Sequence, residues 1–267
     1  MDPLYKRLTF SAILVSVSLY AIFFAPDQIF FLVTVTLGLL GLSEYLSLAQ
    51  KKGITLNRPL GLVLGAVLFF SVYYEAEAVT LAMVFLVISI FNFSRPSREQ
   101  VLLSSAVTVF GIVYVGWFFS HLIKMKALEA GGCWVFYTLL IVKGGDAGAY
   151  FVGKRFGRTQ LIAHVSPNKS VEGAVGGLAV SVILSLLSKI YLPSVPLFHF
   201  LVLGLLAGVL AQLGDLAESL IKRDAGVKDS GHVPGLGGIL DVLDSLLLSI
   251  PFIYYYITSF SHVALRS

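Results

Sequence analysis

Charged residues are scarce in this chain: Asp, Glu, Lys and Arg make up 13% of its 267 residues. Soluble domains usually carry about 25% charged residues, so the composition excludes an ordinary soluble fold. Cysteine is nearly absent too, and the single Cys133 excludes an intrachain disulfide and a cysteine-rich zinc site. Hydrophobic residues are abundant instead, at 57% of the chain with a mean hydropathy of +0.88.

Long apolar runs recur from one end of the chain to the other. A helix needs about 20 mostly apolar residues to cross the hydrocarbon core. We therefore predict an all-α, polytopic integral membrane helical bundle of about nine transmembrane helices. The predicted spans are 8–24, 29–48, 60–75, 79–93, 101–123, 134–153, 171–191, 198–221 and 239–260. The first run resembles a signal peptide, but Ala25-Pro26-Asp27-Gln28 leads straight into the second, so we interpret it as a retained helix.

Basic residues are distributed unevenly between the predicted connections. With a cytoplasmic N-terminus, fourteen Lys and Arg residues fall inside, and only Lys124, Lys126, Lys189 and Arg266 fall outside. Cytoplasmic loops of membrane proteins carry such an excess. We therefore predict a cytoplasmic N-terminus and a C-terminus outside. The net charge of +4 is then explained by topology and anionic headgroups, and no nucleic-acid partner is expected.

The polar connections differ between the two halves of the chain. Those before residue 130 are short, whereas 154–170 and 222–238 are long, rich in Gly, Lys, Asp and Ser, and predicted to face the cytoplasm. We find no internal repeat or soluble linker, so we predict a single integral membrane unit. Residues 1–130 are expected to form helices for structure, dimerisation or lipid contact, and 131–267 to form the catalytic region.

Three predicted spans of the second half carry ionisable groups. Such a group in a spanning helix costs at least about 2.5–3.5 kcal/mol and usually faces a polar cavity or a partner. The helical rise places these groups in the inner half of the membrane, where carboxylate oxygens suit Mg²⁺. We therefore expect a metal-binding cavity open to the cytosol. The ionisable groups are Lys143 and Asp146; Asp215, Glu218 and Lys222; and Asp241 and Asp244, with Ser219 and Ser245 on the same helix faces.

Structural explanations compete with this interpretation for single residues. Asp146 could only pair with Lys143, and Asp241 could only cap a helix N-terminus. Glu44, near a predicted inner helix end, is interpreted as interfacial and structural. Gly173 and Gly177 are spaced for close helix packing.

The two long inner connections also have two interpretations each. Residues 166–173 read Ser-Pro-Asn-Lys-Ser-Val-Glu-Gly and could form a phosphate cradle at a helix N-terminus or an ordinary capped turn. The basic residues of 222–238 could bind a polyphosphate–metal complex or act only as a topogenic signal. His232 could be a base or a ligand, but a lone loop histidine is more often neither.

Three motifs within about residues 143–245 resemble the signature of phosphatidate cytidylyltransferases. They are Asp146-x-Gly148-Ala149-Tyr150-x-x-Gly153-Lys154, Ser166-Pro167-x-Lys169-Ser170-x-Glu172-Gly173, and Ser219-x-x-Lys222-Arg223-x4-Lys228-Asp229-x-Gly231 continuing through Pro234-Gly235 and Gly237-Gly238 to Asp241-x-x-Asp244. The chain departs from the family at Leu236, where His is usual, and at Val242, where Arg is usual. The stretch 231–234 is one residue short, and Ser170 and Val171 replace Thr and an aromatic residue.

The resemblance implies that CTP and phosphatidic acid give CDP-diacylglycerol and pyrophosphate at the cytoplasmic face of a bacterial membrane. It implies one or two metal ions, Mg²⁺ foremost, on Asp215, Asp241 and Asp244, and catalytic roles for these three with Asp146 and Lys222. Substrate binding falls to Lys169, Ser166, Glu172, Ser219, Arg223, Lys228 and Asp229. A homodimer is expected from resemblance alone. An ion-coupled membrane transporter and a CTP-dependent polyprenol kinase are the alternatives.

Overall fold

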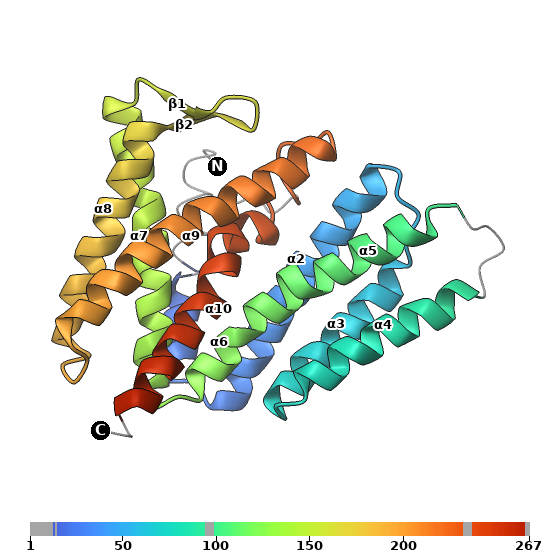
Figure 1. Ribbon diagram of the computed structural model, residues 1–267, viewed down its shortest axis with the longest axis horizontal. Helices are drawn as coiled ribbons and strands as arrows, with labels where there is room; N and C mark the ends of the chain where they lie inside the picture. The colour runs from blue at the N-terminus through green and yellow to red at the C-terminus, as the bar shows by residue number, and fades with distance from the viewer. Residues whose placement is uncertain (1–12, 14, 94–98, 232–236, 265–267) are drawn as a thin grey trace. The chain divides into compact units, whose positions relative to one another are not determined.

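The computed structural model describes residues 13, 15–93, 99–231 and 237–264, with side chains as far as residue 260. This part of the chain is helical apart from one short hairpin (Figure 1). After a helical segment at residues 15–23, the elements are α2 (Asp27–Lys51), α3 (Arg58–Tyr73), α4 (Glu77–Phe93), α5 (Val101–Gly111), the π-helix η1 (Ile112–Trp117), α6 (Phe118–Lys126), α7 (Gly131–Phe156), β1 (Gln160–Ile162), β2 (Ser166–Ser170), α8 (Val171–Leu187), the 3₁₀ helix η2 (Ser188–Ile190), α9 (Leu197–Asp224) and α10 (Ile239–Ala264).

Six helices within the described residues are long and apolar enough to cross a membrane. They are Asp27–Lys51, Val101–Lys126, Gly131–Phe156, Val171–Ile190, Leu197–Asp224 and Ile239–Phe260. Helices α3 and α4 are apolar but have only 16 and 17 residues. The prediction of a helical membrane protein is therefore confirmed. The count of nine spans and the orientation of the termini stay predictions, and the predicted span 8–24 lies partly outside the described residues.

Short polar residues set the starts of two helices. Asn57 precedes α3 and its Oδ1 accepts a hydrogen bond from the N–H of Leu60 at 2.9 Å, which satisfies one of the free donors of the first turn. Ser170 caps α8 in the same way, with its Oγ accepting from the N–H of Gly173 at 3.1 Å. The capped turn considered for residues 166–173 is thus present.

The chain divides into two units, which are described separately. The first consists of Met1–Lys124 and Ile221–Val242, and the second of Met125–Leu220 and Leu243–Ser267. Helices α9 and α10 therefore each contribute residues to both units. The proposed division of labour between residues 1–130 and 131–267 stays a prediction.

Within the first unit, α2 packs against α3, α5 and η1 around side chains such as Leu42 and Leu68 that are fully buried. Glu44 on α2 also reaches the start of α10. Its carboxylate accepts hydrogen bonds from the N–H groups of Ile239 at 3.0 Å and Leu240 at 2.8 Å, and from Ser230 Oγ at 2.7 Å. Glu44 therefore satisfies free donors at a helix N-terminus, which confirms its structural role.

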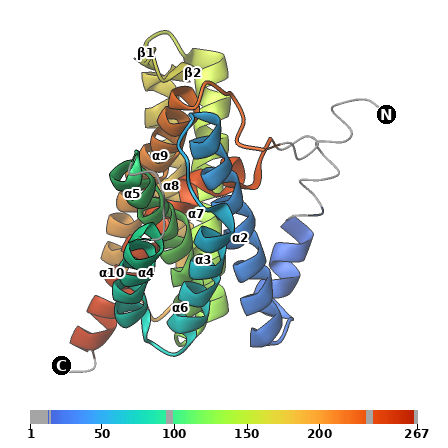
Figure 2. The same ribbon diagram turned by 90° about the vertical axis from the view of Figure 1, so that its right-hand side faces the viewer.

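Within the second unit, α7 and α8 lie side by side along their length (Figures 1 and 2). Small residues make this close approach possible. A Cβ at Gly177 would lie 2.8 Å from the Cβ of Ala149, and one at Gly173 would lie 2.9 Å from the Ala149 carbonyl oxygen. The predicted packing role of Gly173 and Gly177 is confirmed.

A two-stranded antiparallel hairpin joins α7 to α8 (Figure 1). Gln160 pairs with Ser170 and Ile162 with Ser166 across the two strands. The all-α prediction did not include this hairpin, and it treated residues 154–170 as one polar loop. Strands of three and five residues are too short to show a clear alternation of polar and apolar side chains.

Candidate active site

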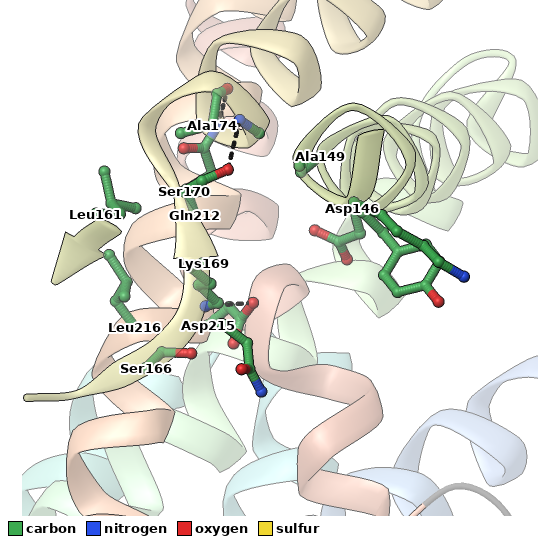
Figure 3. Close-up of a pocket in the computed structure, with 15 residues that line it drawn as sticks. Asp146, Ala149, Leu161, Ser166, Lys169, Ser170, Ala174, Gln212, Asp215 and Leu216 are labelled. Atoms are coloured by element: carbon green, nitrogen blue, oxygen red, sulfur yellow. Dashed lines mark hydrogen bonds and ion pairs between the residues drawn. The ribbon is translucent and has the colours of Figure 1, made fainter. Parts of the chain in front are cut away.

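A cavity of about 600 Å³ lies within the second unit, where α7, α8, α9 and the hairpin meet (Figure 3). Its polar lining includes several of the residues predicted for the site. The lining residues are Asp146, Ala149, Tyr150, Gly153, Lys154, Leu161, Ser166, Asn168, Lys169, Ser170, Gly173, Ala174, Gln212, Asp215 and Leu216. The structure therefore brings Asp146, Asp215, Ser166 and Lys169 together at one cavity.

Asp215 on α9 faces the hairpin. Lys169 Nζ on β2 lies 2.6 Å from Asp215 Oδ2, and both side chains keep about a third of their surface exposed, at 28% and 32%. Figure 3 shows Ser166 beside this ion pair and Asp146 projecting from α7 across the cavity. A carboxylate, an ammonium group and a hydroxyl therefore share one side of the cavity.

A second polar cluster in the same unit involves α7 and α10. Asp146 Oδ2 accepts from Ser245 Oγ at 2.7 Å and lies 3.2 Å from Lys143 Nζ. Lys143 Nζ also donates to Ser245 Oγ at 2.7 Å and lies 3.9 Å from Asp244 Oδ1. The predicted Lys143–Asp146 pair is thus present, but it belongs to a larger network in which one lysine sits between two carboxylates.

Asp241 lies in the first unit and is held by its own set of donors. Lys222 Nζ is 2.5 Å from Asp241 Oδ1, while the N–H groups of Gly238 and Ser230 donate to Oδ2 at 2.7 Å and 3.0 Å. Asp241 therefore does cap the start of α10, as its structural interpretation predicts. The same carboxylate also holds the buried Lys222.

The remaining predicted residues have varied surroundings. Glu172 accepts hydrogen bonds from the N–H groups of Arg158 at 3.0 Å and Thr159 at 3.2 Å, which precede the hairpin. It is not among the residues that line the cavity. Ser219 is buried, and Arg223 is exposed with Nη1 donating to the Val227 carbonyl at 3.3 Å. Lys228 and Asp229 are exposed, and Val242 is half-buried. His232, Leu236 and most of the stretch 231–234 lie outside the described residues.

The donors around the cavity suit a hard divalent cation. Among the described residues, no three His, Cys, Asp or Glu side chains are grouped closely enough to hold a metal by themselves. Mg²⁺, however, is usually bound by one or two carboxylates together with substrate phosphates and water. Asp215 and Asp146 present carboxylate oxygens at the cavity, so the donor set fits a magnesium–phosphate complex better than a metal caged by protein alone.

Several residues at the site were not among the predicted functional residues. Tyr150, Lys154 and Gln212 line the cavity, and Gln212 Nε2 donates to the Ala174 carbonyl at 2.9 Å. Tyr150 and Lys154 stand four and eight residues after Asp146, so helical periodicity places them on its face of α7. The sequence identified Ser245 only as a polar residue on the same span as Asp241 and Asp244, because its hydrogen-bond partners come from another helix.

Comparison with known proteins agrees with the motifs. A sequence model described as "Cytidylyltransferase family" matches residues 5–260. The phosphatidate cytidylyltransferase of Bacillus subtilis is 41% identical over 153 residues, which are 56% of either chain. Those of Chlamydia pneumoniae and Synechocystis are 34% identical over 253 residues and 32% identical over 250 residues. These two alignments cover 84% and 82% of this chain, and 81% and 84% of the relatives. With the family motifs in order and acidic side chains gathered at a cavity, the chain belongs to the cytidylyltransferase family.

Proposed function

We propose that this protein transfers the cytidylyl group of CTP to phosphatidic acid, which gives CDP-diacylglycerol and pyrophosphate. The observation that carries the proposal is the meeting of Asp146, Asp215, Lys169 and Ser166 at one cavity in a chain of the cytidylyltransferase family. The relatives named phosphatidate cytidylyltransferase support this choice of substrates.

The reaction needs positioning and charge neutralisation more than proton transfer. A phosphate oxygen of the lipid attacks the α-phosphorus of CTP, the bond from that phosphorus to the bridging oxygen breaks, and pyrophosphate leaves. The attacking oxygen is already anionic, so little base catalysis is required. Lys169 offsets phosphate charge inside the cavity, and Ser166 donates a hydrogen bond that orients the phosphate.

Magnesium dependence is part of the proposal. Asp215 and Asp146 would hold the metal at the cavity, and Asp244, which contacts the same Lys143 as Asp146, is a further proposed ligand. When bound, Mg²⁺ would neutralise phosphate charge and stabilise the oxygens that enter and leave the α-phosphorus. That Asp241 is a further ligand, and that a second ion binds, both stay predictions.

The roles of Lys222, Arg223 and Lys228 in binding the triphosphate stay predictions. Lys222 is held by Asp241, and Arg223 and Lys228 are exposed cations on the segment that follows. Ser219 and Asp229 are proposed to orient the same substrate. Because CTP is a cytosolic nucleotide, we place the site at the cytoplasmic face of a bacterial inner membrane, with phosphatidic acid supplied by that membrane. The homodimer also stays a prediction.

The experiment is product identification with purified protein in detergent. The protein is incubated with CTP labelled at the α-phosphate, phosphatidic acid and Mg²⁺, with and without chelator. We expect label in CDP-diacylglycerol, stoichiometric pyrophosphate and loss of both with chelator. CDP together with a phosphorylated polyprenol would support the kinase alternative. Ion-driven solute uptake by proteoliposomes without pyrophosphate release would support the transporter.

A further inference from the structure

The cavity in the second unit contains two lysines with different surroundings. Lys169 is neutralised by Asp215, 2.6 Å away. Lys154 has no carboxylate partner among the described residues, and its Nζ lies 5.8 Å from the centroid of the Tyr150 ring. The cavity therefore has a lysine whose charge no neighbouring acid offsets in the described part of the chain, and it is available to an anionic ligand.

Lys154 lies at the end of a spanning helix. It is in the last turn of α7, eight residues beyond Asp146 and so about 12 Å further along the helix axis. Asp146, Tyr150 and Lys154 all line the cavity, which runs along one face of α7 from the acidic group to the helix end. Tyr150 and Lys154 are also exposed, so they form part of the cavity rim.

Exposed aromatic residues also lie on the last turns of α7. Tyr150, Phe151 and Phe156 are 60%, 67% and 58% exposed on the last turns of α7. Aromatic side chains and lysines at the end of an apolar span are typical of the membrane–water interface, where the rings contact lipid and the ammonium group reaches the headgroups. A phosphate that meets Lys154 here would have its acyl chains beside the exposed rings.

We propose that Lys154, with Tyr150 beside it, binds the phosphomonoester of the lipid substrate at the rim of the cavity. The inference deepens the proposed function and rests on it. Lys169 and Asp215 then serve the metal–nucleotide side of the cavity, while Lys154 serves the lipid side. A phosphomonoester carries up to two negative charges and strong acceptor oxygens, so an otherwise uncompensated lysine suits it.

Kinetics can separate the lipid phosphate from the triphosphate of CTP. The full-length enzyme and its K154Q, K154R and R155Q variants are assayed in mixed micelles, with phosphatidic acid and CTP varied separately. Arg155 is the matched control, because it is the adjacent basic residue of α7, does not line the cavity and lies over the Phe156 ring. We expect K154Q to raise the KM for phosphatidic acid about tenfold, with the KM for CTP within about twofold. K154R should recover most of the loss, and R155Q should change neither constant.

A binding measurement without turnover keeps the two proposals distinguishable. Phosphatidic acid should raise the melting temperature of the wild-type protein without CTP, and this shift should be lost in K154Q but kept in R155Q. A K154Q variant that raises only the KM for CTP, or changes neither KM, would overturn the inference even if the wild type makes CDP-diacylglycerol. A wild-type protein that makes no CDP-diacylglycerol would overturn the proposed function. The shift in melting temperature with phosphatidic acid tests only the role of Lys154.

Discussion

Lys169 Nζ on strand β2 lies 2.6 Å from Asp215 Oδ2 on helix α9, so one ion pair joins the hairpin to the acidic helix inside the cavity. Any metal ion that binds Asp215 must compete with this ammonium group. If Asp215 holds Mg²⁺ as proposed, binding of the metal would release Lys169 to contact phosphate.

Replacement of Lys169 by Met should raise the affinity for free Mn²⁺ while lowering turnover. A partly exposed ion pair contributes roughly 1 kcal/mol or less, so we expect affinity to rise by about threefold to fivefold. Electron paramagnetic resonance of Mn²⁺ without nucleotide measures this. Lys51→Met, at the exposed end of α2, is the control and should have no effect. Weaker Mn²⁺ binding by K169M would show that Lys169 does not compete for Asp215.

Ser245→Ala should destabilise the protein because it removes the buried hydroxyl that links Lys143 to Asp146. Ser245 is fully buried, donates to Asp146 at 2.7 Å and accepts from Lys143 at 2.7 Å. Lys143 and Asp146 keep 37% and 33% of their side chains exposed, so water can replace part of the lost bonding and we expect a cost of about 0.5–1.5 kcal/mol. Ser249→Ala, one turn along α10, loses only a bond to the Ser245 carbonyl and should cost less. Thermal unfolding in detergent compares the two, and equal losses would argue against the network.

Glu172→Ala should loosen the hairpin. Its carboxylate accepts from the N–H groups of Arg158 and Thr159, which fixes the start of the hairpin to the first turn of α8. We expect hydrogen exchange at these two amides to accelerate by about an order of magnitude, because both lose a charged hydrogen-bond acceptor. Glu172→Gln keeps one acceptor oxygen and should show a smaller change. If E172Q instead raises the KM for CTP with exchange unchanged, the predicted substrate-binding role of Glu172 gains support over the structural one.

Gly177→Ala should weaken the contact between α7 and α8. The added methyl group would lie 2.8 Å from the Cβ of Ala149 and 2.9 Å from the Gly145 carbonyl oxygen. Overpacking of this kind costs about 1–3 kcal/mol, to be measured as a lower midpoint of thermal unfolding. Gly116→Ala is the matched control, because its Cβ would meet Leu68 at an ordinary 3.5 Å. A G177A protein as stable as G116A would contradict the close packing.

The helices were largely predictable because the thickness of the hydrocarbon core fixes the length of apolar sequence that a spanning helix needs. The predicted span 134–153 is the core of α7, Gly131–Phe156. Helix α7 extends beyond residue 153 because Lys154 and Arg155 are helical although they are exposed. Hydropathy predicts where an apolar span ends, but not where the helix ends. The hairpin was not predicted because its two strands are too short to show an alternation of polar and apolar side chains.

Some residues of the cavity were predictable from the sequence, but their pairings were not. Helical spacing identified Asp146 and Asp215 as groups facing a polar cavity, and both line it. The partner of each acid depends on tertiary packing: Lys169 reaches Asp215 only because strand β2 brings it to α9. Ser245 could not be assigned to Asp146 from sequence because 99 residues separate the two.

Turnover by Asp215→Asn tests the central claim most directly, since it asks whether the cavity carboxylate carries the reaction. CDP-diacylglycerol formation by purified D215N is compared with wild type and with Asp27→Asn, the same substitution in the first turn of α2. We predict that D215N loses activity by at least about a hundredfold while its melting temperature stays close to that of wild type, and that D27N stays active. A D215N protein that makes CDP-diacylglycerol at the wild-type rate would contradict the account.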